Sequence, residues 1–172
     1  MRALVIYESM YGNTQRVAES IASGLGPQVD AIAIEVGAAP SLAEVPFDLL
    51  VNGEPTHVLR MSRRDSRKGA ANDSDRSVIS AEIGIRDWNA AQKEHAVRVP
   101  AATFGTRLKM SRRLTGSAAH NAEKKLRKHG FEMIASTESF FVEGETGPLH
   151  AGEEERAHQW GETLTVKLVT AH

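Results

Sequence analysis

The chain has 172 residues, a formal net charge of −1 and no cysteine. This length is typical of one domain, so we expect residues 1–172 to form a single domain that buries a core without disulfides. The lack of cysteine excludes a thiolate metal site and a cysteine nucleophile. No stretch approaches the roughly 18 apolar residues of a membrane span, so we expect a cytoplasmic protein. The nearly balanced charge gives no reason to expect nucleic acid as a partner.

Short apolar runs alternate with segments of helical periodicity along the chain. Residues 3–7 form an unbroken apolar run, which is typical of a strand buried on both faces of a parallel sheet. Further strands are predicted at 29–36, 47–51, 97–104 and, long or interrupted, 131–142; helices are predicted over 14–25, 78–91, 117–129 and from 153 onward. The polar stretch at 52–75 is predicted to be a long surface segment. The pattern predicts an α/β fold, a doubly wound parallel sheet of five strands with helices on both faces.

Several helix ends carry sequence signals. Gly24 and Gly26 are expected to close the first helix, and Gly130 is a typical left-handed stop for the helix before it. The last helix has glutamates at 153–155 in its first turn, where carboxylates complement the helix dipole. Trp88 and Trp160 lie on apolar helical stripes, which favours a packing role for both.

The loop Ser9-Met10-Tyr11-Gly12-Asn13-Thr14 joins the first predicted strand to the first predicted helix. N–H groups converge at a helix N-terminus, where the positive end of the dipole also lies, so this loop suits an anion. Gly12 allows close approach, and the side chains of Ser9, Asn13 and Thr14 can hydrogen-bond phosphate oxygens. The loop lacks the lysine of a P-loop and the glycines of a dinucleotide fingerprint, which favours a monophosphate. An ordinary helix start capped by Asn13 or Thr14 is the alternative.

This loop resembles the FMN-phosphate loop of flavodoxins, whose pattern is a hydroxyl residue, two variable positions, Gly, any residue and Thr. Asn52-Gly53-Glu54-Pro55-Thr56-His57 is similar to the Gly-x-Pro-Thr loop that lies along the flavin in this family. Thr103-Phe104-Gly105-Thr106-Arg107 resembles the second flavin-flanking loop, and the segment from Gly147-Pro148-Leu149 to Trp160-Gly161 resembles the late part of single-domain members. The resemblance implies a flavodoxin-like strand order, 2-1-3-4-5, with all three loops leaving the C-terminal strand ends.

The resemblance also implies FMN as the cofactor and divides its contacts among the three loops. The implied phosphate contacts are Ser9, Met10, Tyr11, Gly12, Asn13 and Thr14. The implied ring and ribityl contacts are Pro55, Thr56 and His57 on one side, and Thr103, Phe104, Gly105 and Arg107 on the other. A plain turn at residues 55–57 and a core position for Phe104 are the alternatives.

Two basic clusters are predicted to rim this site. Their members are Arg60, Arg63, Arg64, Arg67 and Lys68, and Arg107, Lys109, Arg112 and Arg113. A solvated loop surface is one explanation for them. Electron-carrier flavodoxins are usually acidic around the flavin, so the other explanation is a different partner: an acidic redox protein, or an anionic small-molecule electron donor or acceptor.

The sequence therefore predicts an FMN-binding, flavodoxin-like electron-transfer protein whose cofactor supplies the redox chemistry. A flavodoxin-fold interaction module without flavin, and an NAD(P)H-dependent FMN reductase, are the alternatives. No catalytic acid or base is predicted. No metal site is predicted either, because the seven histidines show no tight ligand spacing.

Overall fold

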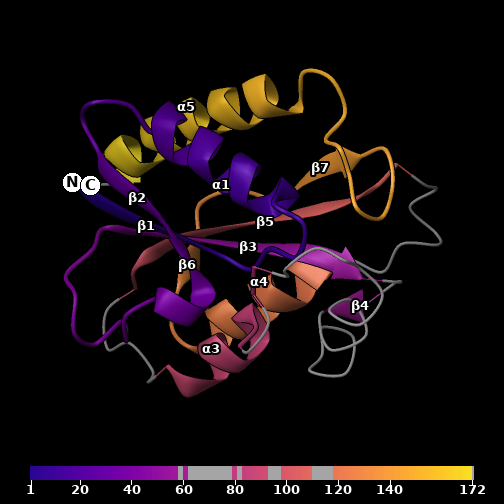
Figure 1. Cartoon of the computed structure of the whole chain (residues 1–172). Coiled ribbons are helices and arrows are strands. Elements are labelled where there is room, and N and C mark those ends of the chain that lie inside the picture. Colours follow the sequence, from indigo (N-terminus) through magenta and orange to yellow (C-terminus); the bar gives the residue numbers. More distant parts are fainter. Residues whose placement is uncertain (58–59, 62–78, 81–82, 93–97, 110–117, 172) are drawn as a thin grey trace.

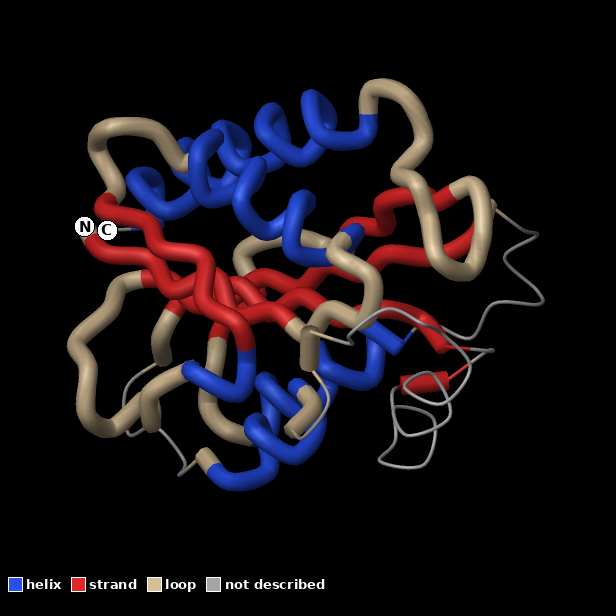
Figure 2. The backbone as a smooth tube through the Cα atoms, viewed as in Figure 1, coloured by secondary structure: helices blue, strands red, loops and turns tan. Residues whose placement is uncertain are grey.

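The computed structural model describes residues 1–57, 60–61, 79–80, 83–92, 98–109 and 118–171. A twisted sheet lies between two helical layers, and the tube in Figure 2 makes the layering plain. Helices α1 (Asn13–Gly24) and α5 (Glu153–Ala171) cover one face, and α3 (Ile85–Ala91) and α4 (Ala118–Lys128) cover the other (Figure 1). Among these described helices, none is long and apolar enough to cross a membrane.

The sheet has the strand order predicted from the sequence. Its strands are β1 (Arg2–Tyr7), β2 (Asp30–Glu35), β3 (Leu49–His57), β5 (Pro100–Leu108), β6 (Glu132–Met133) and β7 (Glu138–Val142). They follow the path β2-β1-β3-β5-β6, all parallel, and β7 also pairs in parallel with β5. This path is the order 2-1-3-4-5 when β6 and β7 together count as the fifth strand. A short β4 (Arg60–Met61) pairs antiparallel with the end of β3.

Several predicted boundaries were wrong. Among the described residues the sheet has seven strand segments rather than five. Strand β4 was not predicted, whereas the break between β6 and β7 agrees with the prediction of a long or interrupted strand over 131–142. Phe47 precedes β3, which begins at Leu49, and its ring stacks on Phe131 at the edge of the core. The strand predicted from residue 97 begins only at Pro100, the first residue of β5, as expected of a residue that has no N–H to donate. Helix α3 begins at Ile85, later than the apolar periodicity suggested.

Alternating side chains on the strands build two apolar cores. On β1, Ala3 and Val5 pack beneath α1 and α5, whereas Leu4 and Ile6 pack beneath α3 and α4. Both tryptophans have the packing role predicted for them. Trp88 is 4% exposed and belongs to the core beneath α3 and α4. The Trp160 ring packs edge-on against Phe104 and Phe140 in the core beneath α1 and α5.

Helices α1 and α5 cross at two glycines. A Cβ on Gly24 would overlap the backbone of His158, and a Cβ on Gly161 would overlap the carbonyl oxygen of Ile21. The two helices therefore approach so closely that neither position has room for a side chain. Gly26 and Gly130 both have positive φ, +73° and +88°, as their predicted stop positions require.

Candidate functional site

The loop predicted to hold a phosphate lies at the C-terminal end of β1 and leads directly into α1. Gly12 is the N-cap, with φ of +88°, a conformation that glycine adopts readily. The alternative, a helix start capped by Asn13 or Thr14, does not hold, because α1 already begins at Asn13. The first turn contains no acidic residue, so the positive end of the helix dipole is not offset there.

Ser9 holds the loop in its curved shape. Its side chain is fully buried, and the hydroxyl oxygen accepts hydrogen bonds from the N–H groups of Gly12 (3.1 Å) and Gln15 (3.4 Å). Because the hydroxyl accepts both of these bonds, it can donate its own proton to an anion.

Thr14 forms a hydroxyl pair with a residue that the sequence analysis did not select. Its hydroxyl oxygen lies 2.8 Å from that of Thr106 on β5, and the two residues are 1% and 5% exposed. One hydroxyl donates to the other, so one proton of the pair stays available for a ligand oxygen. The strand period of two could have identified Thr106, since Ala102, Phe104 and Thr106 share the face beneath α1 and α5.

The segment after β7 lies against the loop. The Asn13 amide donates a hydrogen bond to the Thr146 carbonyl oxygen (3.2 Å). Gly147 follows with φ of +100°, and a Cβ there would meet the Asn13 side chain. These contacts place the late segment that resembled flavodoxins directly beside the predicted phosphate loop.

Ser80 supports the same loop from the other side, although no sequence signal indicated it. The Ser80 hydroxyl accepts from the Ser9 N–H (3.0 Å) and donates to a carboxylate oxygen of Glu35 at the end of β2 (2.6 Å). The N–H groups of Ile79 and Ser80 donate to the carbonyls of Met10 and Ser9. The 79–80 turn therefore clamps the backbone at 9–10.

Two segments predicted to be loops lie inside strands. The stretch 52–57 belongs to β3, and 103–107 belongs to β5. Asn52 and Glu54 are each 1% exposed, so the prediction of a surface segment was wrong for this part of 52–75. The Asn52 amide donates to the Asn89 side-chain oxygen at 2.7 Å, which shows how a polar strand residue can be buried. Residues 58–59 and 62–75 lie outside the described residues.

The ring-side residues have different surroundings. Pro55 is half-buried near the end of β3, and the backbones of Thr56 and His57 pair with β4. Phe104 is fully buried, as its core alternative predicted, and its ring packs edge-on against Phe140 and Trp160.

The neighbours of Phe104 on β5 differ in their contacts. Gly105 pairs with Glu54 of β3 and Ser139 of β7. The Thr103 hydroxyl lies 2.7 Å from that of Thr137, which in turn donates to Glu123. Thr103 is thus part of a polar chain that crosses from the sheet to α4.

Arg107 and Lys109 gather around one aromatic ring. The Arg107 guanidinium lies 5.0 Å and the Lys109 ammonium 5.9 Å from the centre of the Phe141 ring on β7. These two cations belong to the second predicted basic cluster. The side chains of Arg60, Arg63, Arg64, Arg67, Lys68, Arg112 and Arg113 lie outside the part of the chain that the structure describes.

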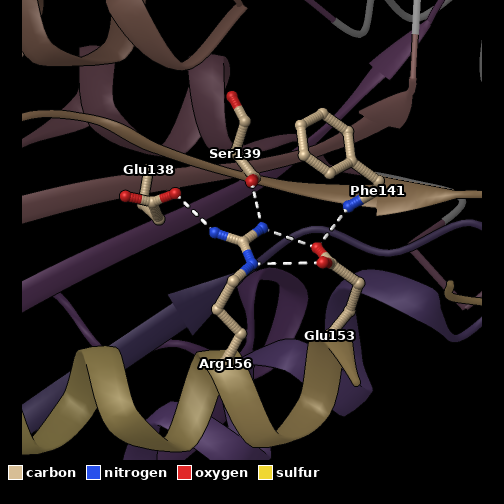
Figure 3. Close-up of polar contacts among 5 residues, drawn as sticks. All are labelled: Glu138, Ser139, Phe141, Glu153 and Arg156. Atoms are coloured by element: carbon tan, nitrogen blue, oxygen red, sulfur yellow. Dashed lines mark hydrogen bonds and ion pairs between the residues drawn. The ribbon is translucent and has the colours of Figure 1, made fainter. Parts of the chain in front are cut away.

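Side chains of α5 cap the backbone of β7, as Figure 3 shows. Arg156 donates to the carboxylates of Glu138 and Glu153, both at 2.6 Å, and to the Ser139 carbonyl. Glu153 accepts the Phe141 N–H at 2.7 Å. Burial would raise the pKa of Glu153, but the bonds from Arg156 and Phe141 outweigh it and hold the pKa below its ordinary value. Strand-edge groups that could pair with another chain are thereby occupied.

Comparisons with known proteins bear on the fold. No family model matches the sequence, and neither does any curated protein. Solved structures do match. An archaeal flavodoxin has a TM-score of 0.67 at 19% identity, covering 98% of this chain and 99% of its own. Flavodoxin 1 from Bacillus cereus has a TM-score of 0.65 at 18% identity, covering 100% and 99%. A flavodiiron core from Synechocystis has a TM-score of 0.63 at 18% identity, with 100% of this chain matching 37% of that one.

The chain therefore has a flavodoxin-like fold, as its sequence predicted. The likeness extends over the whole sheet and both helical layers, since the matches to the two flavodoxins cover nearly all of each chain.

Proposed function

We propose that this protein binds FMN and acts in electron transfer. One observation carries the proposal: a buried strand leads through a glycine-containing loop of neutral donors into a helix start that has no acidic residue. The carboxyl ends of strands near the switch in strand order are where doubly wound sheets bind ligands. Neutral donors at a helix N-terminus suit a single phosphate group.

The residues present fit the phosphate end of FMN. Ser9 and the pair of Thr14 and Thr106 offer hydroxyl donors. A Cβ on Gly12 would lie 3.9 Å from the Ile79 side chain, an ordinary contact distance. We propose the C-terminal ends of β3 and β5, with Pro55, Thr56, His57 and Arg107, for the ring side. FMN supplies the redox chemistry when bound, while the protein binds and orients it.

Spectroscopy and stability measurements test flavin binding. The purified protein is expected to show the visible spectrum of bound flavin, either as isolated or after adding FMN, and to gain thermal stability from FMN. Thr14→Ala should weaken binding by about 1.5–3 kcal/mol, the usual contribution of a hydrogen bond to a charged group. Thr106→Val should weaken it in the same direction, because it removes the other hydroxyl of the pair.

A matched control is Thr163→Ala, an exposed threonine on α5 whose hydroxyl bonds only its own helix in the described structure. This variant should bind FMN as the wild type does. A protein that stays colourless and gains no stability from FMN would instead support the interaction module, which the core position of Phe104 favours.

The partner is a further part of the proposal. Arg107 and Lys109 lie together at the end of β5, which supports an acidic redox protein or an anionic small molecule as electron donor or acceptor. Electron transfer rates should then fall with added salt, and less so in Lys109→Gln.

NAD(P)H oxidation by the flavin-loaded protein would favour the alternative of an NAD(P)H-dependent FMN reductase. We propose the cytoplasm as the location.

A further inference from the structure

Two glutamates lie side by side in the interior, on the face covered by α3 and α4. The Glu8 N–H donates to the Gly53 carbonyl at 2.9 Å, which extends the parallel pairing of Tyr7 with Gly53 by one residue. Glu8 is thereby placed next to Glu54 on the neighbouring strand, and each is only 1% exposed. Both follow the strand period from Leu4, Ile6 and Leu50, which belong to the core on this face.

The two carboxyl groups have different hydrogen-bond environments. A carboxylate oxygen of Glu8 accepts the N–H of Ile85, the first residue of α3, at 3.0 Å. Acceptance of a backbone N–H at a helix start favours the charged form of Glu8. Neither carboxylate oxygen of Glu54 has a hydrogen-bond partner among the described residues. An ionised Glu54 would therefore be buried without a donor, which is costly.

The surrounding charges do not compensate Glu54 fully. Burial raises its pKa to about 8, the charge of Glu8 adds to the rise, and Lys125 of α4 lowers it in part. Burial and Arg86 lower the pKa of Lys125, while Glu54 and Asp87 raise it. β5 presents Gly105 opposite Glu54 and has no ionisable residue from Pro100 to Thr106.

We propose that Glu8 and Glu54 form a proton-binding site that holds one proton at neutral pH, with Glu54 as the neutral acid and Glu8 as the carboxylate that caps α3. Two like charges on adjacent buried positions disfavour each other, so the pair keeps the proton. Loss of the proton puts a second negative charge between the sheet and the helices α3 and α4. Proton release therefore weakens the packing of that helical layer.

The site also lies at the base of both segments that we propose to contact FMN. Glu8 directly precedes Ser9, and Glu54 directly precedes Pro55. Because each glutamate is bonded directly to one of these residues, we expect a change in its packing to move the backbone that follows it. We therefore expect FMN affinity to depend on the proton held here, a consequence that rests on the proposed function, whereas the proton site itself does not.

The direct test compares the flavin-free wild type with Glu54→Gln, since glutamine resembles the neutral acid in shape. The pKa of Glu54 is about 8 in the fold against 4.5 for the ordinary group, so the folded state binds an extra proton between these values. Stability from this proton is complete below about pH 4.5 and is lost as the pH rises to about 8. The unfolding constant of the wild type, divided by that of Glu54→Gln, should rise roughly tenfold per pH unit in this window.

Urea unfolding from about pH 5 to pH 9 measures this ratio, and Glu132→Gln, an exposed carboxylate on β6, is the matched control. The control should follow the wild type at every pH. Parallel pH profiles for the wild type and Glu54→Gln would overturn the proposal.

Infrared spectroscopy gives a second readout that does not require unfolding. The carbonyl band of a protonated carboxylic acid should be present in the wild type and in Glu132→Gln near neutral pH, and absent in Glu54→Gln. If Glu54→Gln does not fold, Glu8→Gln should move the loss of that band to lower pH, because the neighbouring charge is gone. Absence of the band in the wild type would overturn the proposal.

The link to FMN is tested by the Kd of the wild type divided by the Kd of Glu54→Gln. The flavin's own titration affects both Kd values equally and therefore cancels in this ratio. This ratio should rise between about pH 7 and pH 9, and a constant ratio would refute the link while leaving the proton site to the two tests above.

Discussion

The contact between Gly53 and Phe104 offers a test of the core position of the Phe104 ring. A Cβ on Gly53 would overlap three carbon atoms of the Phe104 ring, which is fully buried and held by Phe140 and Trp160. The ring is rigid and fully buried, so Gly53→Ala forces an overpacked core. Such changes typically cost about 1–3 kcal/mol, and we expect the free energy of unfolding to fall by this amount.

A double-mutant cycle makes this prediction specific. Phe104→Leu is destabilising alone because it removes ring carbons from a filled site. In the Phe104→Leu background, however, Gly53→Ala should cost at least about 0.5 kcal/mol less than in the wild type, as residues in contact commonly show. Urea unfolding measures the free energy of unfolding of all four proteins, and their m values should be unchanged. Additive effects, or a Gly53→Ala variant as stable as the wild type, would refute the core placement of Phe104.

Two further predictions concern the helical layer of α5. Gly161→Ala should destabilise the protein by about 1–3 kcal/mol, because the methyl group overlaps the Ile21 carbonyl oxygen, although alanine favours helices. Thermal unfolding of this variant and the wild type measures the loss of stability. Glu153→Gln should cost about 1–2 kcal/mol at neutral pH, since the bonds with the partly exposed Arg156 and with the Phe141 N–H lose their charge. The pKa of Glu153 is lowered, so this difference in stability should persist down to about pH 4.5 and be lost progressively as the pH falls further, through the lowered pKa. Equal stabilities at neutral pH would contradict the reasoning.

The sequence, with its resemblance to flavodoxins, was sufficient for the strand order and for the loop that joins β1 to α1. The apolar run at residues 3–7, which ends in a polar turn, indicated a buried strand, and Gly130 marked a position where the backbone has positive φ. These signals are local, because each depends on a few neighbouring residues. For that reason they could be recognised without knowing what packs against them.

The segments 52–57 and 103–107 were predicted less well, because burial of polar residues depends on distant partners. Asn52 and Glu54 have the composition of a loop, yet Asn52 bonds with Asn89, and Glu54 lies beside Glu8. The pairing of Thr14 with Thr106 joins residues that are 92 positions apart. No local pattern reports such contacts, so a polar strand is easily mistaken for a surface segment.

The most direct test of the account is to compare FMN with riboflavin, which has the same ring but lacks the phosphate. The Ser9 hydroxyl and the Thr14–Thr106 pair offer at least two donors to a phosphate, each contributing about 1.5 kcal/mol or more. Calorimetric titration of the flavin-free protein should therefore show FMN binding at least roughly a hundredfold more tightly than riboflavin. Thr14→Ala should reduce the difference in affinity between FMN and riboflavin. Equal affinities for the two flavins, or no binding of FMN, would contradict a phosphate site in this loop.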